Sequence, residues 1–254
     1  MKIFLWAECQ KLRRLSLLLL TIFAVCGIAF MVFIGGKSTD YGPPYLEEAG
    51  WYMTMIQPWA TLLVLPAVIA LLGSYMICRE AEDDTLKSLL LVPVSETRLT
   101  AAKMLLTFVF SILLYLLLFA ITFLGEAILH IHALSTNMVL HFLKSYFLEG
   151  ICVFLAVSPV IALVAYWKKS YWLALVLAEI YSFAGLFTSM SNTLRTFYPV
   201  SAALGIAGYY ETTGLARIQS SLVLLACGGI SVLILRKLKH GRMNKKREYK
   251  EKMW

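Results

Sequence analysis

The sequence has 254 residues, of which 60% are hydrophobic and 15% are charged, with a formal net charge of +8. Soluble domains contain roughly 45–50% apolar and about 25% charged residues. The composition therefore excludes a soluble enzyme, a disordered chain and a secreted module held together by disulfides.

Long apolar runs predict an all-α membrane protein. A spanning helix needs about 20 apolar residues, and the sequence contains six runs of suitable length. We expect a single transmembrane domain over residues 1–254 with six spanning helices, at about residues 15–36, 56–78, 101–125, 148–167, 170–192 and 218–235.

The first 14 residues precede the first predicted span. Ile3, Phe4 and Ala7 can share one face of a helix, whereas Lys2 and Glu8 can point elsewhere. This pattern predicts an amphipathic helix at residues 1–14 that lies on the inner membrane surface. A frayed basic flank is the alternative.

The second apolar run is longer than one span requires. Proline is favoured in the first turn of a helix, so Pro58 is expected to open the second span. Pro66 is expected to kink it. Residues 49–55 would then lie along the outer surface, with Trp51 and Tyr52 as interfacial aromatic residues.

The inner loop between spans two and three is less lipid-like than its neighbours. Asp83 or Asp84 can cap a short helix at Thr85–Leu91, and Pro93 would end it. The apolar face of this helix consists of Leu86, Leu89 and Leu90.

Two acidic residues, Glu126 and Glu149, are expected at the outer ends of spans three and four. Three histidines lie between them, at positions 130, 132 and 141. Histidine and carboxylate side chains are zinc ligands, but the spacing is generic. We therefore expect a polar outer loop and no metal site.

Span five contains one acidic residue, Glu179. It lies about ten residues past Lys169 and thus roughly 15 Å deep, near the bilayer midplane. A charge at this depth costs about 2.5–3.5 kcal/mol or more. Glu179 is expected either to face a substrate path and contact a cationic substrate, or to be protonated and hydrogen-bonded to a neighbouring span.

The residues around Glu179 are large and apolar or aromatic. They offer a soft wall for an amphipathic substrate, with contact to lipid or to other helices as the alternative. The predicted wall consists of Tyr181, Phe183, Phe187 and Met190.

Residues 196–210 form a charge-free stretch that is too short to cross the membrane. Gly205 and Gly208 permit close packing, and the stretch predicts short re-entrant helices in the outer leaflet before span six.

The distribution of basic residues predicts the orientation of the chain. With the N-terminus inside, inner segments carry 19 Lys and Arg and outer segments carry 4. This asymmetry predicts that both termini are cytoplasmic. Residues 236–254 contain nine Lys or Arg and two Glu, which is typical of a tail that contacts anionic lipid rather than nucleic acid.

The inner loop also contains a recognisable pattern: Glu80-x-Glu82-x-x-Thr85-x-x-x-Leu89-Leu90-x-x-Pro93-Val94-Ser95, followed by Lys103. It resembles the first cytoplasmic loop of ATP-binding-cassette (ABC) type-2 permeases, in particular small bacterial subunits that protect against or export lantibiotics, bacitracin and amphipathic toxin peptides. The opening Glu8-x-x-Lys11-x-Arg13-Arg14 is similar to theirs. Asp84 and Glu96 depart from the pattern, which often has Gly and Arg there.

The resemblance implies that Thr85–Leu91 is a coupling helix seated in a groove of a separate ATPase subunit. It implies an ATPase contact made by Glu80, Glu82, Asp84, Thr85, Leu86, Lys87, Leu89, Leu90 and Pro93, with a second, smaller contact at Lys168 and Lys169. A solvated acidic hinge is the alternative for the loop, and a positive-inside anchor is the alternative for the lysine pair.

The sequence contains no Gly-x-x-x-x-Gly-Lys-Ser/Thr motif. We expect no catalytic residue and no cofactor in this chain, with ATP and Mg²⁺ bound by two copies of the partner ATPase. A second permease, identical or different, would complete the exporter in a bacterial plasma membrane.

The expected function is export of amphipathic antimicrobial or toxin peptides. Export of a lipid or small drug, and ATP-independent sequestration of a peptide by an immunity protein, are the alternatives. An intramembrane protease built on Glu47 and Glu48 is disfavoured, because no Arg follows them at close spacing.

Overall fold

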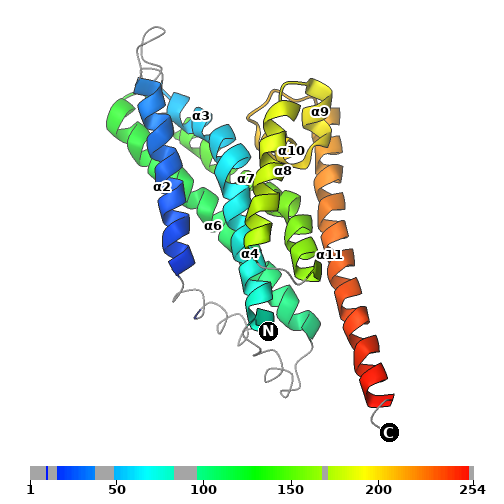
Figure 1. The fold of residues 1–254 in the computed structure, drawn as a ribbon. Coiled ribbons are helices and arrows are strands. Elements are labelled where there is room, and N and C mark those ends of the chain that lie inside the picture. The colour runs from blue at the N-terminus through cyan, green and yellow to red at the C-terminus, as the bar shows by residue number, and fades with distance from the viewer. Residues whose placement is uncertain (1–9, 11–15, 38–48, 83–95, 168–170, 252–254) are drawn as a thin grey trace.

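The computed structural model describes residues 10, 16–37, 49–82, 96–167 and 171–251. Within these ranges the chain is helical apart from short connections, and no strand occurs, which confirms the all-α fold class (Figure 1). The elements are α2 (Ser16–Lys37), α3 (Trp51–Trp59), the π-helical segment η2 (Ala60–Val64), α4 (Leu65–Glu82), α6 (Glu96–His130), α7 (Thr136–Trp167), α8 (Trp172–Thr188), α9 (Asn192–Phe197), α10 (Pro199–Ala207) and α11 (Gly214–Glu251).

Five helical stretches of the described ranges are long and apolar enough to cross a membrane. They are Leu18–Lys37, Trp51–Arg79, Leu99–His130, Thr136–Trp167 and Gly214–Lys237. The predicted fifth span corresponds to α8, which has 17 residues and is therefore about 26 Å long, slightly less than the roughly 30 Å of a hydrocarbon core. The chain is thus a multi-pass helical membrane protein with five or six spans.

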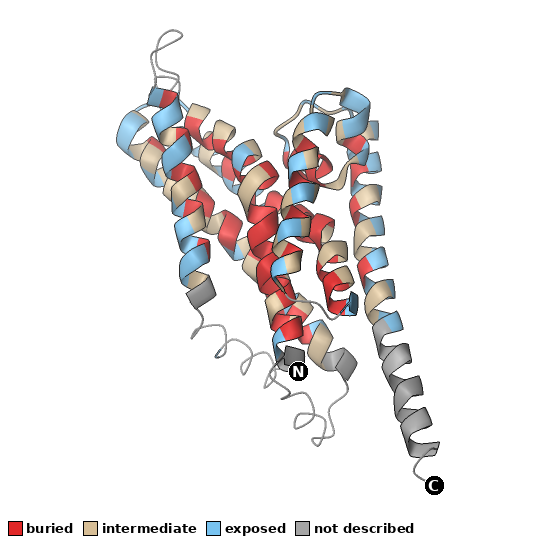
Figure 2. Ribbon diagram, in the orientation of Figure 1, coloured by how far each residue is buried: buried red, intermediate tan, exposed pale blue. Residues whose placement is uncertain are grey.

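Helix α7 lies at the centre of the bundle and packs against α4, α6, α10 and α11. Figure 2 shows the buried residues concentrated on the inward faces of the central helices. Gly150 brings α7 close to α6, because a Cβ at this position would lie 2.9 Å from the Ile112 Cα. The Ser111 hydroxyl donates a hydrogen bond of 2.7 Å to the Gly150 carbonyl at the same place.

Large apolar side chains cover the outside of the bundle. Leu19 and Phe23 on α2 are 74% and 75% exposed, and Leu222 and Leu225 on α11 are 60% and 64% exposed. Aliphatic and aromatic surface of this extent is expected where helices face lipid. The start of α2 and the end of α11 lie at the same end of the bundle, the lower end in Figure 1.

The second span differs from the sequence prediction. Helix α3 begins at Trp51, after Gly50 with φ of +87°, and Pro58 lies inside it rather than opening it. Tyr52 is buried, and its hydroxyl donates a 2.9 Å hydrogen bond to the Ala29 carbonyl. The prediction that Tyr52 is an interfacial residue is wrong because α2 packs over it.

A π-helical segment, η2, lies just before Pro66, and the kink expected at Pro66 stays a prediction. In η2 the backbone N–H of Leu65 bonds the Ala60 carbonyl, one residue further back than in an α-helix. Such insertions are common where a proline interrupts the helical hydrogen-bond ladder. The segment joins α3 to α4 and lies against α8.

The stretch before the last helix forms α9 and α10, with Gly208 at φ of +96° ending α10. Helix α10 is almost entirely buried and packs against α7 and α11. Short helices were predicted here, and the structure contains them. Their placement in the outer leaflet stays a prediction.

Candidate functional site

Several predicted site residues lie outside the described residues. These are the interfacial helix at 1–14, the coupling segment from Asp84 to Pro93, and the pair Lys168 and Lys169. Glu80 and Glu82 belong to the end of α4, but their side chains are not described. The ATPase contact therefore stays a prediction.

The two helices that flank the coupling segment are joined near it. Lys103 on α6 is 3% exposed, and its Nζ donates a 2.5 Å hydrogen bond to the Met76 carbonyl of α4. The Thr107 hydroxyl donates to the Lys103 carbonyl at 2.9 Å. A buried lysine needs such acceptors because its charge has left water. This bond links α4 and α6 at the level of Met76 and Lys103.

Glu179 lies in the middle of α8 and is partly exposed. The buried positions of this helix are small and form one narrow face at Ala174, Ala178, Ser182 and Gly185. An exposed apolar stripe follows the opposite side with helical spacing at Trp172, Val176, Ile180, Phe183, Phe187 and Met190. Glu179 lies at the border between the two faces.

The structure therefore separates the residues predicted to line the substrate path. Phe183, Phe187 and Met190 share the exposed stripe next to Glu179. Tyr181 lies on another side of α8, because residues two apart are about 200° apart around a helix. Its backbone carbonyl accepts a hydrogen bond from the Tyr198 hydroxyl, and the two rings lie 5.3 Å apart.

The segment that follows α10 contacts α9 through a cation–π pair. The guanidinium of Arg195 lies 4.8 Å from the centre of the Tyr210 ring. Burial raises the pKa of the Tyr210 hydroxyl, while a hydrogen bond with Ser189 and the positive charge of Arg195 act in the opposite direction. This phenol thus stays neutral at physiological pH and acts as a hydrogen-bonding group.

Buried polar side chains form a second feature, between α3, η2, α6 and α7. The hydroxyls of Thr61 and Tyr115 lie 2.8 Å apart, and the Tyr146 hydroxyl donates a 2.8 Å bond to the Met53 carbonyl. All three side chains are inaccessible to solvent. Hydrogen bonds of this kind hold the helices in one register, since separating them would strand polar groups in a dry core.

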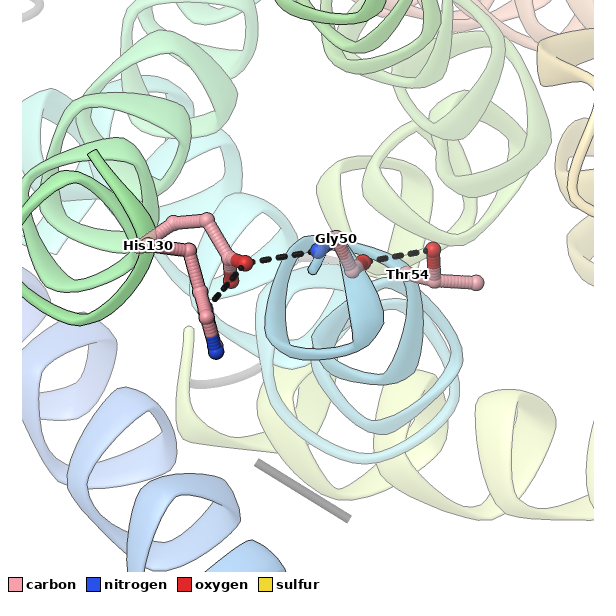
Figure 3. Close-up of polar contacts among 4 residues, drawn as sticks. Gly50, Thr54 and His130 are labelled. Atoms are coloured by element: carbon pink, nitrogen blue, oxygen red, sulfur yellow. Dashed lines mark hydrogen bonds and ion pairs between the residues drawn. The ribbon is translucent and has the colours of Figure 1, made fainter. Parts of the chain in front are cut away.

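Two buried carboxyls accompany these hydroxyls. Glu126 on α6 and Glu149 on α7 are both 0% exposed. Glu126 Oε1 accepts a hydrogen bond from the Gly50 backbone N–H at 2.6 Å and lies within hydrogen-bond distance, 3.0 Å, of His130 Nδ1 (Figure 3). Neither carboxyl oxygen of Glu149 has a hydrogen-bond partner among the described residues.

The expectation of a polar outer loop around these acids is wrong. Helix α6 continues through Glu126 to His130, and α7 begins at Thr136, well before Glu149. The sequence prediction ended each span at the acidic residue because it counted only charge-free residues. In the structure each helix continues past its acid, because neighbouring helices bury the carboxyl. Within the described ranges no group of three His, Cys, Asp or Glu residues is arranged to hold a metal ion.

Comparison with known proteins places these features in a family. The sequence matches the family described as "ABC-2 family transporter protein" over residues 4–185, more than half of the chain. It is also similar to a bacitracin transport permease protein of Bacillus licheniformis, with 27% identity over 111 residues, 44% of this chain and 53% of that relative. The chain thus aligns with about half the length of this curated relative.

Proposed function

Because the chain belongs to the ABC-2 family of transporters, we propose that it is the permease subunit of an exporter driven by a separate ATPase. The family match carries this proposal, and the long apolar helices support it. The sequence has no phosphate-binding loop motif of its own, so ATP and Mg²⁺ would be bound by the partner. One permease pair and two ATPases would make the complete exporter.

The coupling segment is proposed to transmit the ATPase motion. Thr85–Leu91 would lie in the ATPase groove with its leucines as apolar anchors. The bond from Lys103 to the Met76 carbonyl joins α4 and α6 on either side of this segment. ATP-driven closure of the ATPases would then move both helices together and switch the permease between inward- and outward-facing states.

Amphipathic antimicrobial or toxin peptides are the proposed substrates. The similarity to a bacitracin transport permease supports this class, as does the α8 surface that combines Glu179 with Phe183 and Phe187. A carboxylate beside aromatic rings offers complementary contacts to a peptide that carries both cationic and apolar side chains.

The proposed setting is a bacterial plasma membrane with both termini in the cytoplasm. The basic residues of the predicted inner segments and of the tail support this orientation. The start of α2 and the end of α11 lie at one end of the bundle, as this orientation requires (Figure 1).

The proposal is tested by isolating the tagged chain from its native membranes in mild detergent and identifying what accompanies it by mass spectrometry. A stoichiometric ABC ATPase is expected, and Leu89→Asp should release it because the anchor face becomes charged. Ser88→Asp is the matched control, since position 88 would lie opposite the leucine face of the predicted helix. If neither isolation nor cross-linking at Leu89 captures an ATPase, the sequestering alternative replaces this proposal.

A further inference from the structure

Glu149 is a buried acid that the proposed transport mechanism does not use. It lies in the interior of α7, and its side chain is 0% exposed. Both of its carboxyl oxygens are buried without a hydrogen-bond partner among the described residues. An ionisable side chain in this situation is rare within membrane-spanning helices and is usually functional.

The groups around Glu149 do not compensate a negative charge. The titratable groups within electrostatic reach are Tyr115 on α6, Tyr146 and Cys152 on α7, and Tyr209 after α10. All four are neutral side chains. Among the described residues, no Lys, Arg or His acts on this carboxyl. The hydroxyls of Tyr115 and Tyr146 are already bonded to Thr61 and to the Met53 carbonyl.

Glu126 provides the internal comparison. It is as deeply buried as Glu149, but its Oε1 accepts a hydrogen bond from the Gly50 N–H and lies within hydrogen-bond distance of the His130 ring. Its Oε2 is buried without a partner among the described residues, so one oxygen of this carboxyl is compensated by polar contacts. Among the described residues, neither oxygen of Glu149 has such a contact. An ionised carboxylate in a dry interior without a partner is so unfavourable that the group takes up a proton instead.

We propose that Glu149 is a proton-binding site, which holds a proton in the packed arrangement described here and releases it to water when α7 separates from α6 and α10. The residue after it, Gly150, makes the close contact with α6 through Ser111 and Ile112. Opening of the bundle at this level therefore exposes the carboxyl and breaks the α6–α7 contact in one movement.

The proposal fixes the sign of a pH effect. The closed arrangement binds one more proton than the open one, so raising the pH favours opening. For one linked proton, the opening equilibrium changes by up to about tenfold per pH unit. The effect disappears when residue 149 has no proton to release.

The protonated acid is detected directly by infrared spectroscopy of the full-length chain in lipid vesicles. At a pH where exposed glutamates are ionised, the wild type should retain a protonated-carboxyl band that Glu149→Gln removes and Glu179→Gln leaves in place. A wild type without the band, or a Glu149→Gln variant that keeps it, overturns the proposal. If the Gln variant does not assemble, Glu149→Met carries the same comparison.

The linkage to opening is measured at Cys152, one turn along α7 from Glu149 and only 6% exposed. In a chain whose other cysteines are replaced, the labelling rate of Cys152 by a water-soluble thiol reagent reports opening. In the wild type the labelling rate should rise with pH more steeply than in Glu149→Gln, by up to about tenfold per pH unit. An ionised Glu149 disfavours the reactive thiolate of Cys152. Direct repulsion would therefore slow labelling in the wild type as the pH rises, which is opposite to the effect expected from opening. Equal slopes overturn the linkage.

Discussion

Glu126 Oε1 lies 2.6 Å from the Gly50 backbone nitrogen and accepts its hydrogen bond, which joins the C-terminal part of α6 to the residue before α3 (Figure 3). Gly50 adopts φ of +87°, a conformation that glycine reaches without strain. The Thr54 hydroxyl donates to the Gly50 carbonyl at 2.9 Å. Gly50 thus links the beginning of α3 to α6 through its N–H and holds the first turn of α3 through its carbonyl.

Replacing the acid of this connection should destabilise the protein. Glu126→Ala leaves the buried Gly50 N–H without its acceptor, and such a loss costs about 1–3 kcal/mol. Glu126→Gln retains a carbonyl oxygen at the same place and should recover part of the stability. Thermal unfolding in detergent measures the difference, with the exposed Glu211→Gln as control. Equal midpoints for the Ala variant and the control would contradict the structural role of Glu126.

A second prediction concerns the contact between α6 and α7. A Cβ added at Gly150 would lie 2.9 Å from the Ile112 Cα, which is backbone and cannot move alone. Gly150→Ala should therefore destabilise the bundle by about 1–3 kcal/mol through overpacking. At Gly229 on α11 no atom lies within 4 Å of the same added carbon. Gly229→Ala should be neutral or stabilising, and comparable losses in both variants would refute the close approach at Gly150.

The hydrogen bond between Thr61 and Tyr115 can be tested by a double-mutant cycle. Thr61→Val and Tyr115→Phe each leave the other hydroxyl buried without its partner, at a cost of about 1–3 kcal/mol. The double variant removes both groups, so its loss should be smaller than the sum of the single losses. Additive losses in unfolding free energy would show that the two hydroxyls do not interact.

Glu179 gives a prediction about transport. If this carboxylate contacts a cationic substrate, Glu179→Gln removes an interaction of about 1.5–3 kcal/mol, which corresponds to a loss of about tenfold or more in transport. Resistance of cells to bacitracin is the readout, and Leu222→Ala on the exposed face of α11 is the control. Unchanged resistance in the Gln variant, at equal membrane abundance, would reject substrate contact at this position.

The sequence predicted the helices from apolar length alone, and it placed Glu179 in the middle of one of them, as α8 confirms. It failed where burial depends on distant segments. Tyr52 was assigned to the interface because nothing in its neighbourhood shows that α2 covers it. Glu149 was taken as the end of a span because a carboxyl is counted as a break, whereas surrounding helices enclose it.

The grouping around Glu179 failed for a different reason. Residues near one another in sequence were combined into one wall, although Tyr181 turns away from the stripe that contains Phe183 and Phe187. The periodicity of a helix already places Tyr181 on a different face from Phe183 and Phe187, so the sequence alone could have separated them. The contact from Lys103 to Met76, in contrast, requires the packing of α4 on α6 and could not be predicted from either segment alone.

The most direct test of the account is ATP-driven uptake of fluorescent bacitracin into inverted membrane vesicles that contain the chain and its co-purified ATPase. The account predicts accumulation that requires ATP, disappears in Leu89→Asp and persists in Ser88→Asp. Equal retention of the peptide with and without ATP, unaffected by Leu89→Asp, would contradict an ATP-driven permease and identify the chain as a peptide-sequestering protein.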